Sequence, residues 1–306
     1  MCNLVGMSDC NLKAGQLRSL EEILEIRVIG RIELILDIFA MRAKTKASAL
    51  QVELAQLMYI LPRLKGLGGV LSRLGGGIGT RGPGESMLET DRRHIRKRIE
   101  KIKQELQKYS THLANTRKNR STLTFSLVGY TNAGKTSLVN RLSSSPKKLF
   151  AEDRLFATLD SFSRKVYLGQ IDGRPGYCVV TDTIGFIQNL PASLVAAFRS
   201  TLEEIIFTDA VIMVVDASSS RLVEEIRVVE AELESIGALD KPRILFFNKE
   251  DLVFKDDRLE LEKNFPEAIW GSTLNKAGVA SLRQKLYEFL IEINSEQNGE
   301  AHSDLP

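Results

Sequence analysis

The chain has few cysteines, and the three it has (Cys2, Cys10 and Cys178) are too widely spaced for a disulfide framework or a zinc site. Cys178 lies in an apolar, strand-like run, where a buried and unreactive thiol is expected. No apolar stretch approaches the roughly 18–20 residues of a membrane span. The opening residues, Met1 to Leu4, lack the basic and apolar regions of a signal peptide. A cytoplasmic protein is therefore expected.

The chain also has little net charge, only +3 over 306 residues, but that charge is unevenly distributed. Between Pro62 and Arg120 there are fifteen Lys and Arg against five Asp and Glu, so the remainder of the chain is acidic. One basic segment on an acidic protein favours a polyanionic partner such as nucleic acid. A solvated helix face is the alternative interpretation of the same charges.

Two amphipathic helices are predicted in residues 47–120. In the first, apolar residues recur at steps of four and three: Leu50, Leu54, Leu57, Leu61 and Leu64. The second has the same kind of seam: Leu88, Ile95, Ile99, Ile102, Leu106, Tyr109 and Leu113. Two such helices joined by one loop should form an antiparallel pair. Pro62 is expected to end or kink the first helix.

The loop between these helices is unusually rich in glycine, with six glycines in residues 75–84. A backbone with few side chains can approach nucleic acid closely, and Arg73 and Arg81 could contact phosphates. A plain flexible linker is the other interpretation. Residues 1–46, before the helices, are too few to close a sheet and are expected to be a partial α/β segment.

Residues 121–294 alternate apolar strand-like runs with amphipathic helices. The predicted strands are 124–129, 165–168, 178–182, 210–216, 243–248 and 269–271, and the helices lie near 135–144, 192–206, 220–236, 256–264 and 279–293. This alternation predicts an α/β fold with a mostly parallel sheet and helices on both faces. The polar tail, 295–306, is expected to be disordered.

A phosphate-binding loop is predicted directly after the first of these strands. Residues 129–136 match G-x-x-x-x-G-K-[ST] and read Gly129-Tyr130-Thr131-Asn132-Ala133-Gly134-Lys135-Thr136. Backbone N–H groups and the following helix N-terminus suit phosphate oxygens. Lys135 is expected to reach the outer phosphates, and the Thr136 hydroxyl to bind magnesium.

A second motif follows the strand at 178–182 and reads Asp182-Thr183-Ile184-Gly185. Its carboxylate can reach magnesium, usually through water, and the Gly185 N–H can contact a terminal phosphate. Between the two motifs, the loop residues Phe156-Ala157-Thr158-Leu159-Asp160 offer a second magnesium ligand in Thr158, an assignment that rests on spacing and on the resemblance described below. Lys135, Thr158 and Gly185 are the residues expected to act in catalysis.

The motif Asn248-Lys249-Glu250-Asp251 points to guanine as the base. A carboxylate at Asp251 can accept hydrogen bonds from N1–H and the 2-amino group of guanine, whereas adenine would leave it unpaired. Backbone contacts to the base are expected from a last loop, Ser272-Thr273-Leu274. Together these motifs predict a guanine-nucleotide switch that binds GTP or GDP with Mg²⁺.

With these motifs the chain resembles the HflX-type ribosome-associated GTPases. The matching stretches are 51–57, the glycine-rich string 75–85, Asp91-Arg92-Arg93, 129–136, 156–160 and 182–187. The resemblance implies a monomeric P-loop GTPase that binds the large ribosomal subunit and its RNA, inserts its helical pair toward the peptidyl-transferase region, and helps to split or rescue stalled ribosomes. It also implies a longer N-terminal α/β domain, of which this chain would hold only the end.

Several residues depart from the family pattern. Ser161-Phe162 replaces the usual Pro-Thr, Thr273 replaces Ala, and Lys276 replaces Gly, which could loosen the contacts to guanine. Phe186 stands where many GTPases have a water-orienting Gln, so slow intrinsic turnover is expected. Asn132 resembles a potassium-coordinating asparagine, although a turn-favouring role explains it equally well.

Two further hypotheses belong to other classes: a nucleotide-gated RNA-binding or ribosome-assembly module with negligible turnover, and a shortened product that folds poorly.

Overall fold

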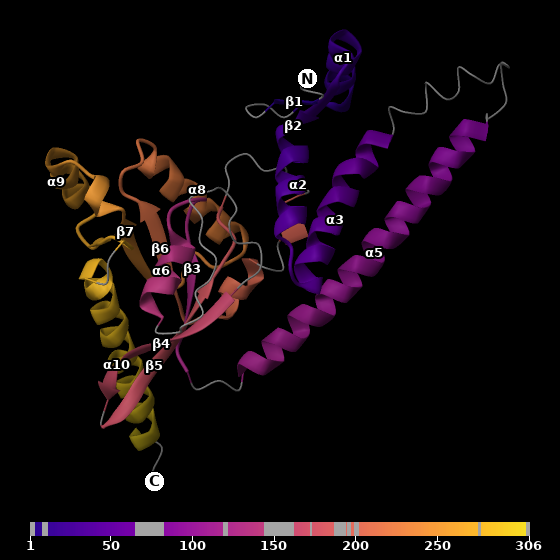
Figure 1. Ribbon diagram of the computed structural model, residues 1–306. Helices are drawn as coiled ribbons and strands as arrows, with labels where there is room; N and C mark the ends of the chain where they lie inside the picture. The colour runs from indigo at the N-terminus through magenta and orange to yellow at the C-terminus, as the bar shows by residue number, and fades with distance from the viewer. Residues whose placement is uncertain are drawn as a thin grey trace. The chain divides into compact units, whose positions relative to one another are not determined.

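The computed structural model describes residues 4–7, 12–64, 83–118, 122–143, 162–171, 173–186, 194, 197–198, 202–274 and 277–303 (Figure 1). Contacts divide the chain into two units. One unit comprises residues 1–113 together with 189–200, and the other comprises 114–188 together with 201–306. The first unit is therefore discontinuous in sequence, because it takes in a short segment that lies between two parts of the second.

The first unit begins with a small βαβα arrangement. Its elements are β1 (Leu4–Met7), α1 (Ala14–Leu24), β2 (Arg27–Gly30) and α2 (Arg31–Arg42). The two strands run parallel, with Val5 opposite Val28, as a connecting helix requires. α2 buries Phe39, whose ring packs edge-on against Phe198 at a centroid distance of 4.9 Å. The apolar run at 34–39 lies within α2 and is thus helical.

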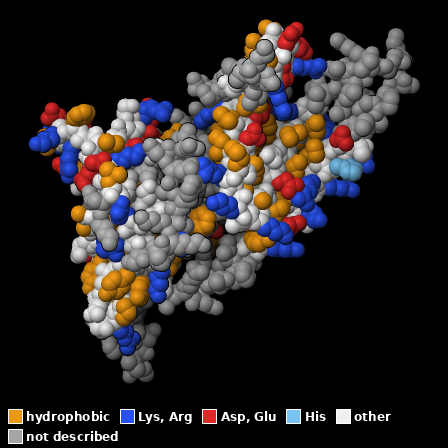
Figure 2. All heavy atoms as spheres, in the orientation of Figure 1, with side chains coloured by type: hydrophobic (Ala, Val, Ile, Leu, Met, Phe, Trp, Pro, Cys, Tyr) orange, Lys and Arg blue, Asp and Glu red, His pale blue; other side chains and the backbone are white. Residues whose placement is uncertain are grey.

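A long helical pair, α3 (Lys46–Arg63) and α5 (Pro83–Lys118), completes the first unit. The Glu53 carboxylate accepts from Arg98 Nε at 2.6 Å and from Arg98 Nη2 at 2.7 Å. Lys46 lies 3.9 Å from Glu105, so the residue earlier in α3 pairs with the one later in α5. The helices are therefore antiparallel, as their seams predict. Figure 2 shows blue Lys and Arg side chains along α5.

The glycine-rich loop lies largely outside the described residues, and it ends two residues earlier than predicted. α5 starts at Pro83, so the last two residues of the predicted tip (75–84) belong to its first turn. Proline suits that position because its φ is already helical and no N–H is left unsatisfied. Residues 65–82, including Arg73 and Arg81, lie outside the described part of the chain.

The second unit contains a six-stranded sheet in the order β4-β5-β3-β6-β7-β8 (Figure 1). The strands are β3 (Thr124–Val128), β4 (Phe162–Ile171), β5 (Arg174–Asp182), β6 (Ala210–Asp216), β7 (Arg243–Asn248) and β8 (Ile269–Trp270). All neighbouring pairs are parallel except β4 and β5, which form an antiparallel edge. The predicted, mostly parallel α/β sheet is confirmed.

Apolar side chains alternate along the central strands and feed two cores, one on each face of the sheet. On one face Phe125, Leu127 and Ile212 pack with residues of α6 (Lys135–Leu142) and α10 (Ala280–Ser303). On the other, Val211, Met213 and Phe247 pack with α8 (Leu222–Ser235) and with Leu261 of α9 (Lys255–Asn264). This period-two alternation is why helices cover both faces.

Two predicted elements differ at their ends. α10 continues to Ser303, so the tail expected to be disordered from residue 295 is helical over most of its length. Residues 295–303 contain no proline, and adding a residue to an existing helix costs far less than starting one. The helix expected at 192–206 ends in a 3-10 turn, η3 (Glu203–Phe207). No helix in the described ranges is both long and apolar enough to cross a membrane.

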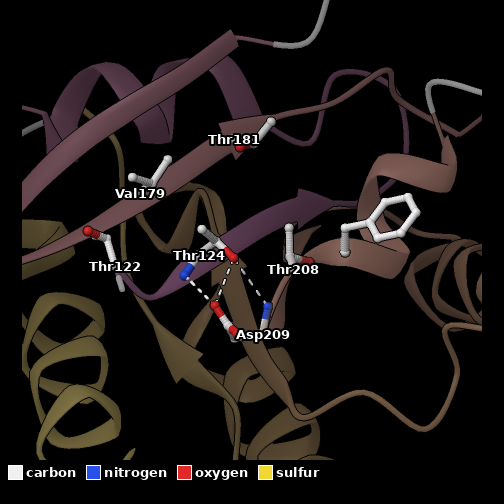
Figure 3. A pocket seen from close by; sticks show the side chains of 7 residues that line it. Thr122, Thr124, Val179, Thr181, Thr208 and Asp209 are labelled. Carbon is white, nitrogen blue, oxygen red and sulfur yellow. Dashed lines mark hydrogen bonds between the residues drawn. The ribbon is translucent and has the colours of Figure 1, made fainter. Parts of the chain in front are cut away.

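At the amino ends of β3 and β6, a hydrogen-bonded clamp joins the two strands (Figure 3). Asp209 Oδ2 accepts from the Thr124 N–H at 2.6 Å and from Thr124 Oγ1 at 2.8 Å. The small hollow beside this clamp, about 60 Å³, is lined largely by threonines. The clamp therefore joins β3 and β6 at the ends opposite those that carry the predicted motifs.

Candidate functional site

The predicted nucleotide motifs meet at one edge of the sheet. The phosphate-binding loop follows β3, Asp182 ends β5, Asn248 ends β7, and Ser272 follows β8. These four strands run parallel, so their carboxyl ends lie together. Ligands of open α/β sheets bind in this position.

The phosphate-binding loop has the backbone that its glycines allow. Gly134 has φ +95° and caps α6, and a Cβ there would lie 2.2 Å from Asn248 Nδ2. Asn132 adopts φ +64°, a left-handed conformation that asparagine tolerates better than most residues. The turn alone therefore accounts for an asparagine at position 132.

Lys135 is buried at the centre of the loop. Its Nζ donates to Gly129 O at 3.0 Å and to Tyr130 O at 2.8 Å. Burial lowers the pKa of Lys135 from 10.5 to about 8, and the nearby Asp182 carboxylate opposes that shift. The ammonium is thus held by neutral carbonyls in a site where an anionic ligand would stabilise its charge.

Thr136 and Asp182 lie in direct contact, since Thr136 Oγ1 donates to Asp182 Oδ2 at 2.7 Å. Hydroxyl and carboxylate oxygens are ligands that Mg²⁺ accepts, and it usually keeps several waters and phosphate oxygens as well. The pair therefore fits magnesium. Among the described residues no group of three or more His, Cys, Asp or Glu could hold a metal. Thr158, with the rest of 156–160, lies outside them.

The segment after Asp182 runs alongside the phosphate-binding loop. Thr183 Oγ1 donates to Leu127 O at 2.6 Å, and Phe186 N donates to Gly129 O at 3.1 Å. In return, Thr131 N donates to Phe186 O at 3.1 Å. A Cβ on Gly185 would lie 2.9 Å from Thr131 Cα and 3.0 Å from Lys135 Nζ. The glycine is therefore favoured where this segment crosses the backbone of the loop.

Phe186 points its side chain into the core and not toward the loop. It is buried in the cluster that contains Val128, Leu202 and Ile205. Because the ring has no hydrogen-bonding group, this position offers nothing that could orient a water.

On the base side, Asn248 joins two loops. Its Nδ2 donates to Ala133 O at 2.8 Å, and its Oδ1 accepts from Thr273 N at 3.2 Å. Lys249 has φ +63°, and its Nζ donates to Asp216 Oδ2 at 2.7 Å. These contacts hold the loops after β7 and β8 against the phosphate-binding loop.

The remaining residues of the two predicted base-side motifs follow β7 and β8. Glu250 and Asp251 form a 3-10 turn, η4 (Glu250–Leu252), and the Asp251 side chain is exposed. Glu250 N donates to Gly271 O at 3.2 Å. In the last loop Leu274 N donates to Ser272 Oγ at 3.3 Å. Asp251 is thus open to solvent beside a loop that is itself ordered by hydrogen bonds.

Comparisons with known proteins agree with this geometry. Three family models match the chain, described as "GTP-binding GTPase N-terminal" (residues 3–40), "GTP-binding GTPase Middle Region" (42–120) and "50S ribosome-binding GTPase" (124–249). The "GTPase HflX" of Flavobacterium psychrophilum is 38% identical over 309 residues, which cover 94% of this chain and 73% of that protein. The chain belongs to the HflX family of GTPases.

Other HflX relatives are more similar but longer. The "GTPase HflX" of Caldanaerobacter subterraneus is 50% identical over 82% of this chain and 58% of its own length; that of Escherichia coli is 43% identical over 94% and 67%. The chain thus spans about six tenths of these relatives. Among solved structures, a Sulfolobus solfataricus GTP-binding protein in complex with GDP is 26% identical, with a TM-score of 0.55 over 95% of this chain and 81% of that one.

Sequence reasoning missed two residues of this HflX site, Arg141 and Asp216. Asp216 ends β6 and holds Lys249, so an acidic residue at a strand end was an available signal. Arg141 lies on α6 and contacts the last loop, more than 130 residues away in sequence. No local pattern could have indicated that contact.

Proposed function

We propose that the chain binds GTP and GDP with Mg²⁺ and hydrolyses GTP. The observation that carries this proposal is the convergence of Lys135, the Thr136–Asp182 pair, Gly185 and Asn248 at one sheet edge. Lys135 would hold the outer phosphates, and the Gly185 N–H would contact the terminal one. Asp251 would accept from N1–H and the 2-amino group of guanine.

Thr136 and Asp182 would hold magnesium, the Asp usually through water, with Thr158 as the second predicted protein ligand. A bound magnesium ion neutralises charge on the transferring phosphoryl group and its leaving group. The residues of the chain would then bind and orient: Lys135 and the backbone N–H groups of the loop would hold the outer phosphates in position for attack. We expect slow turnover, because Phe186 is turned into the core and cannot orient the attacking water.

Potassium is a further candidate ligand near Asn132. A monovalent cation at this point would add positive charge beside the phosphates, as the resemblance of Asn132 suggests. GTP turnover should then be faster in potassium than in sodium at equal ionic strength. Equal turnover in the two salts would contradict this role and leave Asn132 as a turn residue.

We also propose that the GTP-bound chain acts on the large ribosomal subunit, in ribosome splitting, rescue or recycling in the cytoplasm. The helical pair supports this because its outer face carries exposed cations, among them Arg93, Arg96, Lys97 and Lys101. Such a face suits RNA phosphates. The family model over residues 124–249 carries a matching description.

A single-turnover GTP assay with and without purified large subunits tests both proposals. Subunits should raise the hydrolysis rate and should sediment with the GTP-bound chain. The double variant Arg93→Ala/Lys97→Ala should weaken sedimentation and reduce its salt dependence. Lys255→Ala, which removes an exposed cation from α9, is the matched control and should have no effect. If subunits change neither rate nor sedimentation, the ribosomal proposal is wrong.

A second function, a nucleotide-gated RNA-binding or assembly module with negligible turnover, is favoured by one observation. The segment at Gly185–Phe186 is hydrogen-bonded to the phosphate-binding loop, and Phe186 is part of the core. Under this function the same assay would give GTP-dependent sedimentation with no acceleration of hydrolysis.

A further inference from the structure

Arg141, in the last turn of α6, holds the last loop by its carbonyl groups. Its Nε donates to Thr273 O at 2.9 Å, and its Nη2 donates to Leu274 O at 2.6 Å. Two N–H groups of one planar guanidinium thus bind two successive carbonyls, which fixes the orientation of both peptides.

Within its described residues, 272–274, the last loop has little apolar packing, since Leu274 is 72% exposed. The base of the loop is closed, since Ser272 N donates to Gly278 O at 3.0 Å and a Cβ on Gly271 would lie 1.9 Å from Gly278 O. Thr273 and Leu274 are therefore held by polar contacts, and the guanidinium of Arg141 supplies two of these.

These contacts complete a chain of hydrogen bonds that begins and ends at the phosphate-binding loop. Asn248 donates to Ala133 O in that loop and accepts from Thr273 N. Thr273 O then accepts from Arg141, and the helix of Arg141 starts at Lys135 of the same loop. Both backbone groups of Thr273 are thus hydrogen-bonded, the N–H to Asn248 at the end of β7 and the C=O to Arg141 on α6. Its carbonyl cannot turn while both contacts hold.

The orientation of these carbonyls matters for the base. A purine with a 6-oxo group needs hydrogen-bond donors from the loop, whereas a 6-amino group needs acceptors. Carbonyls of Thr273 and Leu274 that are bound to Arg141 have a fixed orientation and one of their two lone pairs occupied, so they are not free to turn toward a 6-amino group. If they were released, they could turn toward a 6-amino group and accept from it.

We propose that Arg141 is a positioning residue that sets the preference of this site for 6-oxopurine over 6-aminopurine nucleotides. The inference rests on the proposed guanine-nucleotide binding. Arg141 acts through the Thr273 and Leu274 carbonyls and does not contact the base itself.

The test is the affinity of the wild type and of Arg141→Met for GDP, IDP and ADP, by competition against a fluorescent GDP analogue. IDP keeps the 6-oxo group but lacks the 2-amino group that Asp251 is proposed to bind. The affinity of Arg141→Met for both GDP and IDP should be about tenfold lower than that of the wild type, which is the size expected for the loss of hydrogen bonds to a charged group. ADP affinity should hold or rise, because its phosphates bind the same loop, so the GDP-to-ADP ratio should fall about tenfold.

Two further variants keep the inference testable. Arg141→Lys keeps the charge but offers no planar fork, and it should give a ratio between those of the wild type and Arg141→Met. Arg227→Met removes an exposed arginine from α8 and should leave the ratio unchanged. An unchanged ratio in both Arg141 variants, or equal losses for GDP, IDP and ADP, overturns the positioning role. Failure of the wild type to bind GDP would instead overturn the proposed function.

Discussion

Asn248 offers a sharp test of how the site is held together. Its side chain is 1% exposed and makes two hydrogen bonds, one to Ala133 O and one from Thr273 N. Replacing it with alanine removes both partners at once. A buried carbonyl and a peptide N–H would then be left unsatisfied unless water or a loop movement reached them.

The cost can be bounded from these contacts. An unsatisfied buried polar group costs about 1–3 kcal/mol, so two such groups place the loss in unfolding free energy at roughly 2–6 kcal/mol. For a domain of this size 1 kcal/mol corresponds to about 2–4 °C in Tm, so we expect Asn248→Ala to melt roughly 4–24 °C lower. GDP affinity should fall by at least about tenfold, because the two loops that frame the ligand are no longer joined.

Thermal melts followed by circular dichroism, and GDP titrations well below the variant Tm, measure these two effects. Asn264→Ala is the matched control, because that asparagine lies exposed at the end of α9 and should change neither quantity. A Tm within 1 °C of the wild type together with GDP affinity within twofold would refute the reasoning. It would mean that Asn248 does not join the loops in solution.

Three other predictions follow from titratable groups. Burial lowers the pKa of Lys135 to about 8, and bound phosphate favours the ammonium, so GDP binding at pH 8 should take up as much as about half a proton. Calorimetry in two buffers of different ionisation enthalpy measures this uptake, and equal heats of binding in the two buffers would contradict it. The Arg98 guanidinium lowers the pKa of Glu53, so this pair stabilises the packing of α3 against α5 at neutral pH and does so less as the pH falls through that pKa. Because both side chains are partly exposed, Glu53→Gln should lower the free energy of unfolding by at most about 1 kcal/mol, measured by denaturant titration at pH 7. Burial raises the pKa of Cys178 to about 12, so with the other two cysteines replaced by serine the native protein should react with a thiol reagent only as fast as it unfolds.

The strands that carry the motifs were predictable because they are buried on both faces. β6 and β7 have the predicted bounds, since each contains an uninterrupted apolar run, 210–215 in β6 and 244–247 in β7. The edge pair was harder. β4 alternates exposed and buried residues and extends well beyond the predicted Lys165–Leu168 core, because an edge strand needs apolar residues on only one side.

The site divides in the same way. Gly134, Lys135 and Asn248 are dictated by backbone geometry and phosphate chemistry, so a short pattern identifies them. Arg141 depends on carbonyl groups brought near by the whole sheet, and a helical arginine is most often simply solvated. Contacts of this kind follow from tertiary structure and leave no trace in local spacing.

The discontinuity of the first unit has a consequence for how the chain is synthesised. Phe39 packs against Phe198, which leaves the ribosome roughly 160 residues later, on the order of 10 seconds at typical bacterial elongation rates. By then β3, β4 and β5 have already been made. The side of α2 that contacts Phe198 must therefore wait for this partner while these strands are synthesised, so the first unit cannot complete its packing before part of the second has left the ribosome.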